Sequence, residues 1–299
     1  MIILYVFLGI VALIFVYMLA VAISNRPSKI NSEDAILHNV DKDLVAKHLS
    51  DAVQCATVSL SDDNHNDKPF FQFHDFIEKS YPLFAKTAVK TVISKYSLIF
   101  FIEGSDKTLK PACFLSHQDV VPAPAKGWDV PPFSGEIKEG YVYGRGSQDM
   151  KSQLIASLDA IEILLDKGFK PLRSIFFCFG HDEEVTTKLG APKIVEYLKD
   201  KKVELEFVFD EGGAILDGKI LGIDNKLAMI GTCEKGYADI LLTASEPGGH
   251  ASTPGKKTAL GELSKAIIRL NKNPMPSRWT KTSQDMFDSL SPYMKPAFK

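Results

Sequence analysis

The side chains with the clearest chemical potential in this sequence are one histidine and several carboxylates. They form four short clusters, which are His117 with Asp119, Asp149 alone, Glu183 with Glu184, and Asp210 with Glu211. One imidazole with many carboxylates and no thiolate is the donor chemistry of a hydrolytic zinc, manganese or cobalt site, whereas a structural zinc site would use cysteine. If these anions converge, their repulsion needs compensation, and two divalent ions about 3.5–4 Å apart would supply it.

Each cluster taken alone also has an ordinary structural explanation. Asp119 could be a turn or capping residue, and Asp149 could cap a helix that begins near Lys151. Glu183 and Glu184 could be a solvated acidic pair, and Asp-Glu before Gly-Gly is a common loop composition. The metal-site hypothesis therefore depends on whether the four clusters meet in space.

Three short apolar runs precede most of these clusters and are predicted to be buried strands. They span 112–116, 174–180 and 205–209, and each continues directly into polar, acidic or histidine residues. The segments between them, 151–166 and about 191–199, carry apolar residues at helical spacing. Strands that alternate with helices predict an α/β sheet covered on both faces, with ligands beyond the carboxyl ends of the strands. We therefore expect the clusters to share one crevice.

Five motifs in this order resemble the dinuclear zinc exopeptidase and aminoacylase family. They are S-H-Q-D-V-V-P (116–122), G-W-D-V-P-P-F-S-G (127–135), G-R-G-S-Q-D-M-K (144–151), G-H-D-E-E-V (180–185) and D-E-G-G (210–213). The similarity extends over about residues 41–270 and is greatest to the branch of carboxypeptidase S and N-fatty-acyl-amino-acid synthase/hydrolase. It implies a three-layer α/β catalytic domain with a central, mostly parallel sheet. The implied activity is metal-dependent hydrolysis of amide or peptide bonds, by a carboxypeptidase or an N-acyl-amino-acid hydrolase.

The resemblance also implies which residues bind metal. His117 binds one ion and Asp149 bridges two, which are zinc ions with manganese or cobalt as alternatives. Glu184 binds one of the two ions and Asp210 the other. Glu211 is the alternative to Asp210, because family members differ in which acid of the D-E-G stretch they use.

Three further residues receive catalytic roles from the resemblance. Asp119 orients the imidazole of His117 and raises its basicity. Glu183 takes a proton from the attacking water and returns it to the leaving amine. His250, in the segment G-G-H-A-S-T-P, matches a lid-domain histidine that polarises the scissile carbonyl, often across a dimer.

One feature of the sequence departs from that family. Family members use a further metal-binding histidine near their C-terminus, whereas no histidine follows His250 here. The chain also stops inside the part that resembles the lid, so we expect it to be truncated relative to its relatives. The alternative function is a catalytically inactive remnant that acts as a membrane-tethered or non-enzymatic protein.

The first 23 residues are apolar or aromatic except for Gly9. This length suits one helical crossing of a bilayer. We expect residues 1–24 to be either a transmembrane anchor, in the membrane through residues 2–23, or a cleaved signal peptide. The family resemblance favours a lumenal or extracellular catalytic domain, membrane-anchored or secreted.

The rest of the chain is expected to contain two domains. Residues 25–232 are assigned to the first part of the catalytic domain, and residues 233–299 to the start of an inserted α+β lid or dimerisation domain. In the latter, 236–244 is predicted to be a strand and 256–270 a helix. The net charge of −2 shows no basic footprint for nucleic acid. The expected partners are a peptide or N-acyl amino acid substrate and a second copy of the chain.

Overall fold

The computed structural model describes residues 1–26, 40–61, 64–185, 188–250, 252–253, 255, 257–295 and 298. The chain divides into two compact units. One spans Ala35–Glu211, and the other combines Met1–Asp34 with Gly212–Lys299. The domain boundary expected at residues 232/233 stays a prediction.

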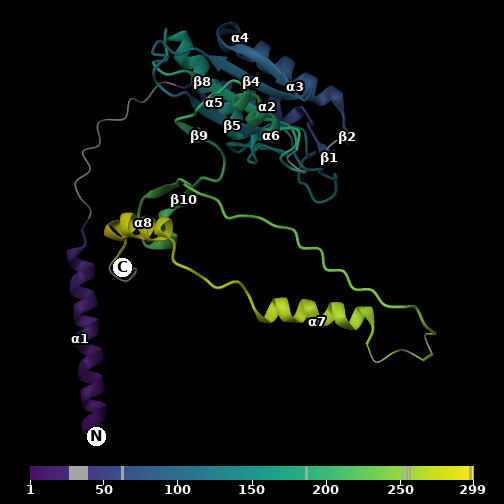
Figure 1. Ribbon diagram of the computed structural model, residues 1–299. Helices are drawn as coiled ribbons and strands as arrows, with labels where there is room; N and C mark the ends of the chain where they lie inside the picture. Colours follow the sequence, from purple (N-terminus) through teal and green to yellow (C-terminus); the bar gives the residue numbers. More distant parts are fainter. Residues whose placement is uncertain are drawn as a thin grey trace. The chain divides into compact units, whose positions relative to one another are not determined.

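A five-stranded mixed sheet forms the centre of the unit Ala35–Glu211 (Figure 1). Its strands, in spatial order, are β3 (Val89–Ile93), β4 (Ser97–Ile102), β8 (Ile175–Gly180), β5 (Ala112–His117) and β9 (Phe207–Phe209). Strand β5 is parallel to β8 and β9, whereas β4 is antiparallel to both of its neighbours. Four of these five strands therefore run in one direction. The expected α/β class is confirmed, and the β3–β4 hairpin extends the sheet beyond the three strands that the apolar runs predict.

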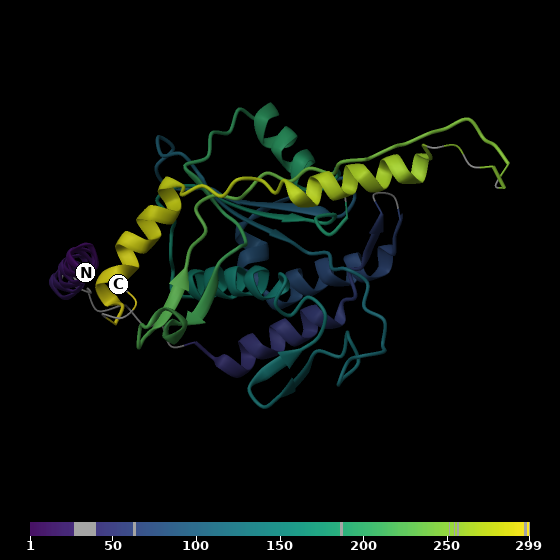
Figure 2. The same ribbon diagram turned by 90° about the horizontal axis from the view of Figure 1, so that it is seen from below.

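Helices cover both faces of this sheet, which gives the three layers expected (Figure 2). One face packs against α2 (Lys42–Gln54), α3 (Asp67–Ser80), α4 (Pro82–Thr87) and α5 (Lys151–Asp166). The other face packs against α6 (Ala191–Asp200). The helix predicted over 151–166 is therefore confirmed residue for residue.

The residues of strand β4 pack alternately against the helices on the two faces of the sheet. Leu98, Phe100 and Ile102 belong to the core beneath α2–α5, whereas Ile99 and Phe101 pack toward α6. Successive side chains of a strand point to opposite faces, so a run of apolar residues is needed where both faces are covered. This explains why the central strands are continuously apolar.

Two small hairpins complete this unit. Strand β1 (Ser59–Ser61) pairs with β2 (Asn64–His65), and β6 (Glu136–Lys138) pairs with β7 (Tyr141–Tyr143). The β6–β7 hairpin contacts α2. Its chain continues directly into the loop before α5.

The C-terminal part of the other unit has a short hairpin and two helices. Its elements are β10 (Ala214–Asp217), η1 (Gly218–Leu221), β11 (Lys226–Met229), α7 (Ala259–Lys272), α8 (Lys281–Leu290) and η2 (Ser291–Tyr293). The helix predicted at 256–270 is present as α7. The strand predicted at 236–244 is wrong, because these residues form neither helix nor strand. A segment with a strand-like sequence becomes a strand only where a neighbouring backbone pairs with it, and residues 236–244 have no such partner among the described residues.

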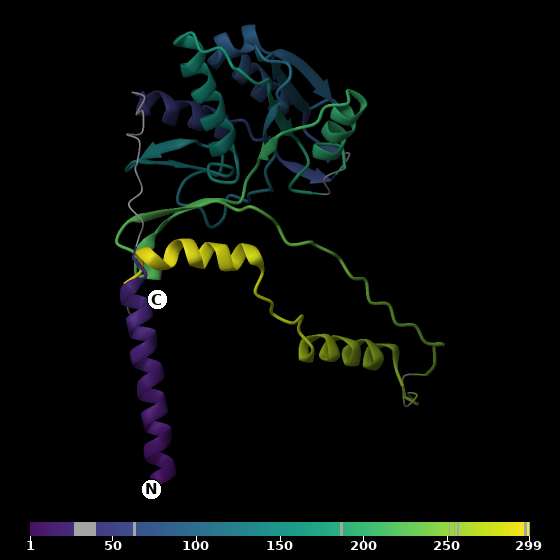
Figure 3. The same cartoon turned by 60° about the vertical axis from the view of Figure 1, so that its left-hand side comes forward.

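The N-terminal segment forms one uninterrupted helix, α1 (Ile2–Ser24) (Figure 3). Among the described residues it is the one helix long and apolar enough to cross a membrane. A signal sequence passes the same test of length and composition, so both expectations for this segment stand.

Candidate active site

Three of the four predicted clusters follow strands that end at the same edge of the sheet. His117 ends β5, Glu183 and Glu184 follow β8, and Glu211 follows β9. Because β5, β8 and β9 are parallel, their carboxyl ends lie together. The structure thus brings these side chains to one edge of the sheet.

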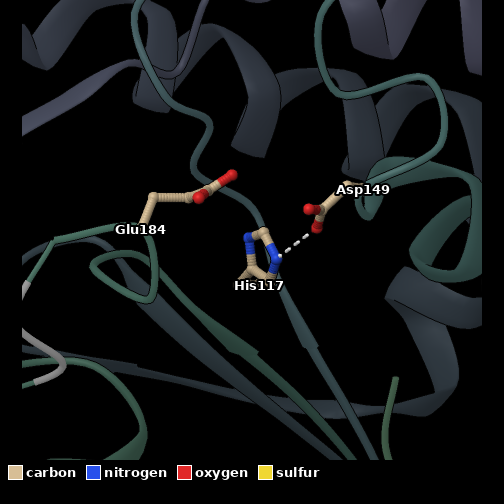
Figure 4. A group of neighbouring side chains, drawn as sticks. All are labelled: His117, Asp149 and Glu184. Atoms are coloured by element: carbon tan, nitrogen blue, oxygen red, sulfur yellow. Dashed lines mark hydrogen bonds and ion pairs between the residues drawn. The ribbon is translucent and has the colours of Figure 1, made fainter. Parts of the chain in front are cut away.

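His117 lies at the centre of this group. Its Nε2 atom is 3.1 Å from Oδ1 of Asp149, 3.6 Å from a carboxylate oxygen of Glu211 and 3.9 Å from one of Glu183. Asp149 and Glu184 flank the ring on either side (Figure 4). Two sets of potential ligand atoms, each within 4.8 Å of one another, share the histidine: His117 with Asp149 and Glu184, and His117 with Glu183 and Glu211.

The second ring nitrogen of His117 determines its tautomer. Nδ1 lies 3.0 Å from the backbone carbonyl of Asp119 and 3.5 Å from its carboxylate. A carbonyl can only accept, so Nδ1 carries the proton and donates it to this carbonyl. Nε2, on the side of the carboxylates, is left free to bind a cation when the ring is neutral.

Asp119 is fully buried and has a second task that its sequence position does not indicate. Its carboxylate accepts hydrogen bonds from the backbone N–H groups of Glu183 (3.3 Å) and Glu184 (3.1 Å). Asp119 therefore contacts both His117 and the acidic loop that follows β8. Asp119 therefore does more than shape a turn, because it links the end of β5 to the loop that follows β8.

Asp149 does not cap the helix that follows it. The N-cap of α5 is Met150, which makes no capping bond through its side chain. The carboxylate of Asp149 faces His117 instead, and its side chain is 68% exposed. The capping explanation considered from the sequence is therefore wrong for this residue.

The electrostatics of the group favour an added cation. Burial raises the pKa values of Glu183, Glu184 and Glu211, and the neighbouring carboxylates raise them further. Burial alone would lower the pKa of His117, but Asp119, Glu183 and Glu211 outweigh it and raise that pKa to about 10. The carboxylates thus hold a proton on the imidazole where a metal ion would neutralise them better. Imidazole and carboxylate donors fit zinc, manganese or cobalt.

Two predicted site residues, Asp210 and His250, belong to neither of the two sets of potential ligand atoms that share His117. Asp210 raises the pKa values of Glu183 and Glu211 through its charge, which indicates proximity, but Glu211 is the residue whose oxygen reaches His117. His250 belongs to the other compact unit and is exposed. The roles assigned to both stay predictions.

Sequence reasoning missed the buried polar residues behind the site. Asp182 accepts hydrogen bonds from the backbone N–H groups of Lys188, Leu189 and Gly190, at 2.6–2.8 Å, and so anchors the far end of the acidic loop. Lys151 is fully buried in the first turn of α5. Its position on the same helical face as Ile155 was a signal that could have found it, because that face points into the core.

Comparison with known proteins adds independent findings. The model of peptidase family M20/M25/M40 matches residues 113–285. An N-fatty-acyl-amino acid synthase/hydrolase, PM20D1, of Xenopus tropicalis is 41% identical over 286 residues, which is 94% of this chain and 55% of that protein. Carboxypeptidase S of Saccharomyces cerevisiae is 36% identical over 263 residues, covering 83% of this chain and 45% of that protein.

Human carnosine dipeptidase 1 is among the solved structures that the chain matches. It superposes with a TM-score of 0.48 at 20% identity, over 57% of this chain and 38% of that one. The chain spans about half the length of the curated relatives that it matches.

Proposed function

This chain belongs to peptidase family M20/M25/M40, and from that premise we propose that it hydrolyses the amide bond of a peptide or an N-acyl amino acid. The names of its relatives, a carboxypeptidase and an N-fatty-acyl-amino acid synthase/hydrolase, support this substrate class. In both kinds of substrate the scissile bond is an amide between an acyl group and an amino acid.

The observation that carries the proposal is the convergence of one imidazole with four carboxylates. Three of these carboxylates follow parallel strands, and Asp149 comes from the loop before α5. These side chains form two sets that share His117, and within each set the potential ligand atoms lie within 4.8 Å of one another. A loop composition or a solvated acidic pair would not require this convergence. A hydrolytic metal site would require it.

We assign the ligands of two metal ions to this group. His117 and Glu184 would each bind one ion, Asp149 would bridge both, and Asp210 or Glu211 would complete the second. Zinc is the proposed metal, with manganese or cobalt as alternatives. Bound at this position, the ions would polarise the scissile carbonyl and lower the pKa of the attacking water.

Glu183 is the proposed general base. Burial raises the pKa of its carboxyl group, and the neighbouring carboxylates add to this increase against the opposing charge of His117. The higher pKa lies nearer to neutral pH, where a general base has to work. Its side chain is 48% exposed, so a substrate can reach it. It would take a proton from the attacking water and later deliver it to the leaving amine. His250 would contribute a hydrogen bond to the developing oxyanion.

The N-terminal helix bears on where the chain acts, and the C-terminal segment bears on whether two copies pair. We propose that α1 is either an anchor or a signal segment and that the catalytic unit is lumenal, extracellular or secreted. We also propose that residues 233–299 belong to a lid through which two copies pair. The amphipathic helix α7, whose apolar face includes the exposed Leu260 and Ile267, supports such pairing.

The test is metal analysis of the purified chain combined with hydrolysis assays on N-acyl amino acids and dipeptides. We expect bound zinc, hydrolysis that a chelator abolishes, and loss of both metal and hydrolysis in Asp149→Ala. Asp166→Ala, at the far end of α5, is the matched control and should retain both. A chain that binds zinc yet hydrolyses none of these substrates would favour the non-enzymatic alternative.

A further inference from the structure

A lysine amine lies buried behind the loop that carries Asp149. Lys151 is 0% exposed, and its Nζ donates to the carbonyl oxygens of Ala52 (2.9 Å) and Cys55 (2.6 Å) at the end of α2. It also lies 5.2 Å from the centre of the Phe73 ring. Among the described residues no carboxylate lies within 4.0 Å of this amine. Burial of an amine without a paired anion is costly, and the two carbonyl oxygens are the partners that the fold offers it.

The two carbonyls do not need the lysine in order to be satisfied. The carbonyl of Ala52 also accepts from the backbone N–H of Cys55 (3.2 Å), and the carbonyl of Cys55 accepts from that of Thr57 (2.8 Å). Removal of the amine would leave neither oxygen without a partner. The contact therefore serves the segment that carries Lys151 more than it serves α2.

That segment is a short loop closed at both ends. The backbone N–H of Lys151 donates to the carbonyl of Gly146 (3.0 Å), and the lysine stem lies against Gly146, where an added Cβ would meet it at 3.4 Å. The same Cβ would come within 2.6 Å of the Val120 side chain, and Gly146 has φ +84°, so the close approach requires glycine. Asp149 is the exposed carboxylate on this closed loop.

A second contact ties the loop to β5. The backbone N–H of His117 donates to the sulfur of Met150 (3.2 Å), and Met150 is itself buried. Asp149 thus comes directly before two anchored residues of the same loop, Met150, which is bound to β5, and Lys151, which is bound to α2. The 3.1 Å approach of Asp149 to His117 depends on this frame.

We propose that Lys151 is a positioning residue for the metal site, which fixes the loop that presents Asp149 to His117. It touches neither substrate nor metal and acts through Asp149 alone. This inference rests on the proposed function, because it assigns a task within the same site.

The test is Lys151→Met in the full chain, which keeps the length and volume of the side chain and removes the donor. Cobalt binding is followed by visible absorption, zinc binding by competition, and the metal-free chain by urea unfolding. We expect the affinity for cobalt and the affinity for zinc to fall about 10–100-fold each, as for other residues that orient metal ligands. The unfolding midpoint should stay or rise, since replacing a buried charge by an apolar side chain is often neutral or stabilising. A lysine that only stabilises the fold would give the opposite pattern.

Two further variants make the result decisive. Lys47→Met on α2, where the lysine is 64% exposed, should change neither metal affinity nor stability. Lys151→Gln keeps one donor and should bind metal with intermediate affinity, which also covers a Lys151→Met chain that fails to fold. Unchanged cobalt and zinc binding in Lys151→Met, or in a folded Lys151→Gln, would overturn the inference while the proposed function stands. A wild-type chain that binds neither ion would overturn both.

Discussion

The unit Ala35–Glu211 and the segment Gly212–Lys299 contain similar local sequence patterns but use them differently. In the first, the apolar face of α5 is buried, with Leu154 and Leu158 inaccessible to solvent. In the second, α7 and α8 are also amphipathic helices, yet neither contains a buried residue. The difference is that α5 has a sheet to cover, whereas α7 covers no described element. An amphipathic sequence specifies a face, and packing decides whether that face is buried.

The proposed site residues are also distributed unequally between the two units. The proposed metal ligands and Glu183 all belong to the unit with the buried core, where Asp119 and Asp182 anchor their loops. His250 is the one proposed catalytic residue in the other unit. Each experiment that follows tests whether chemistry and stability are concentrated in the first unit.

The largest effect is expected for Glu183→Gln. Losing the proton acceptor should lower kcat about 10²–10⁴-fold. Zinc content should stay near that of the wild type, because Glu183 is assigned no ligand role. Kinetics and elemental analysis of the same preparation check this, with Glu196→Gln on the exposed side of α6 as control. Loss of zinc together with activity would show instead that Glu183 is a ligand.

His250→Ala tests the contribution of the second unit. Loss of one hydrogen-bond donor to a developing oxyanion should lower kcat about 10²–10³-fold. Zinc content and the unfolding midpoint should not change, since His250 is exposed and outside the ligand group. If kcat is unaffected, the chemistry lies wholly within Ala35–Glu211.

A matched pair of leucine truncations compares the packing of the two regions. Leu158→Ala on α5 should lower the free energy of unfolding by about 2–5 kcal/mol, because it removes a fully buried side chain. Leu260→Ala on α7, where the leucine is 75% exposed, should change it by less than about 0.5 kcal/mol.

Fluorescence can follow the two units separately during urea unfolding. Trp128 lies in the first unit and Trp279 in the second, so each leucine variant is measured in a background that keeps the tryptophan of its own unit. A large loss of stability in Leu260→Ala would mean that the apolar face of α7 is covered in solution, as pairing of two copies would require.

The smallest effect concerns pH. Burial lowers the pKa of His74, aided by the charge of Lys90 and opposed by Gln118, which the ring contacts at 3.1 Å. The folded unit therefore holds His74 neutral, whereas the unfolded chain protonates it near pH 6.5. Its contribution to stability is present above pH 6.5 and is lost as the pH falls toward the lowered value in the fold.

Urea unfolding at several pH values checks this, with Trp128 as the reporter. The loss of stability between pH 7 and pH 5 should be smaller in His74→Gln than in the wild type. The same titration reported by Trp279 should show no difference between the two chains. An equal slope in both chains at Trp128 would contradict the assignment.

Local sequence patterns determined most of the first unit. Apolar residues at helical spacing predicted α5 over its observed length, and three apolar runs that end in polar residues predicted β5, β8 and β9. Because these strands are parallel, the pattern also implied that His117, Glu183 and Glu211 would meet. Periods of two and 3.6 residues, and the polarity of a strand, are properties of neighbouring residues and can therefore be read from the chain.

Tertiary packing decided what those patterns left open. It determined that Asp149 faces His117 and does not cap α5, and that Glu211 is the acid whose oxygen reaches His117. It also buried Lys151 behind the loop that carries Asp149 and left residues 236–244 without a strand partner. Each of these outcomes depends on distances between residues that are far apart in the chain. Such distances arise from how helices and strands pack against one another, which the spacing of residues along a sequence does not encode.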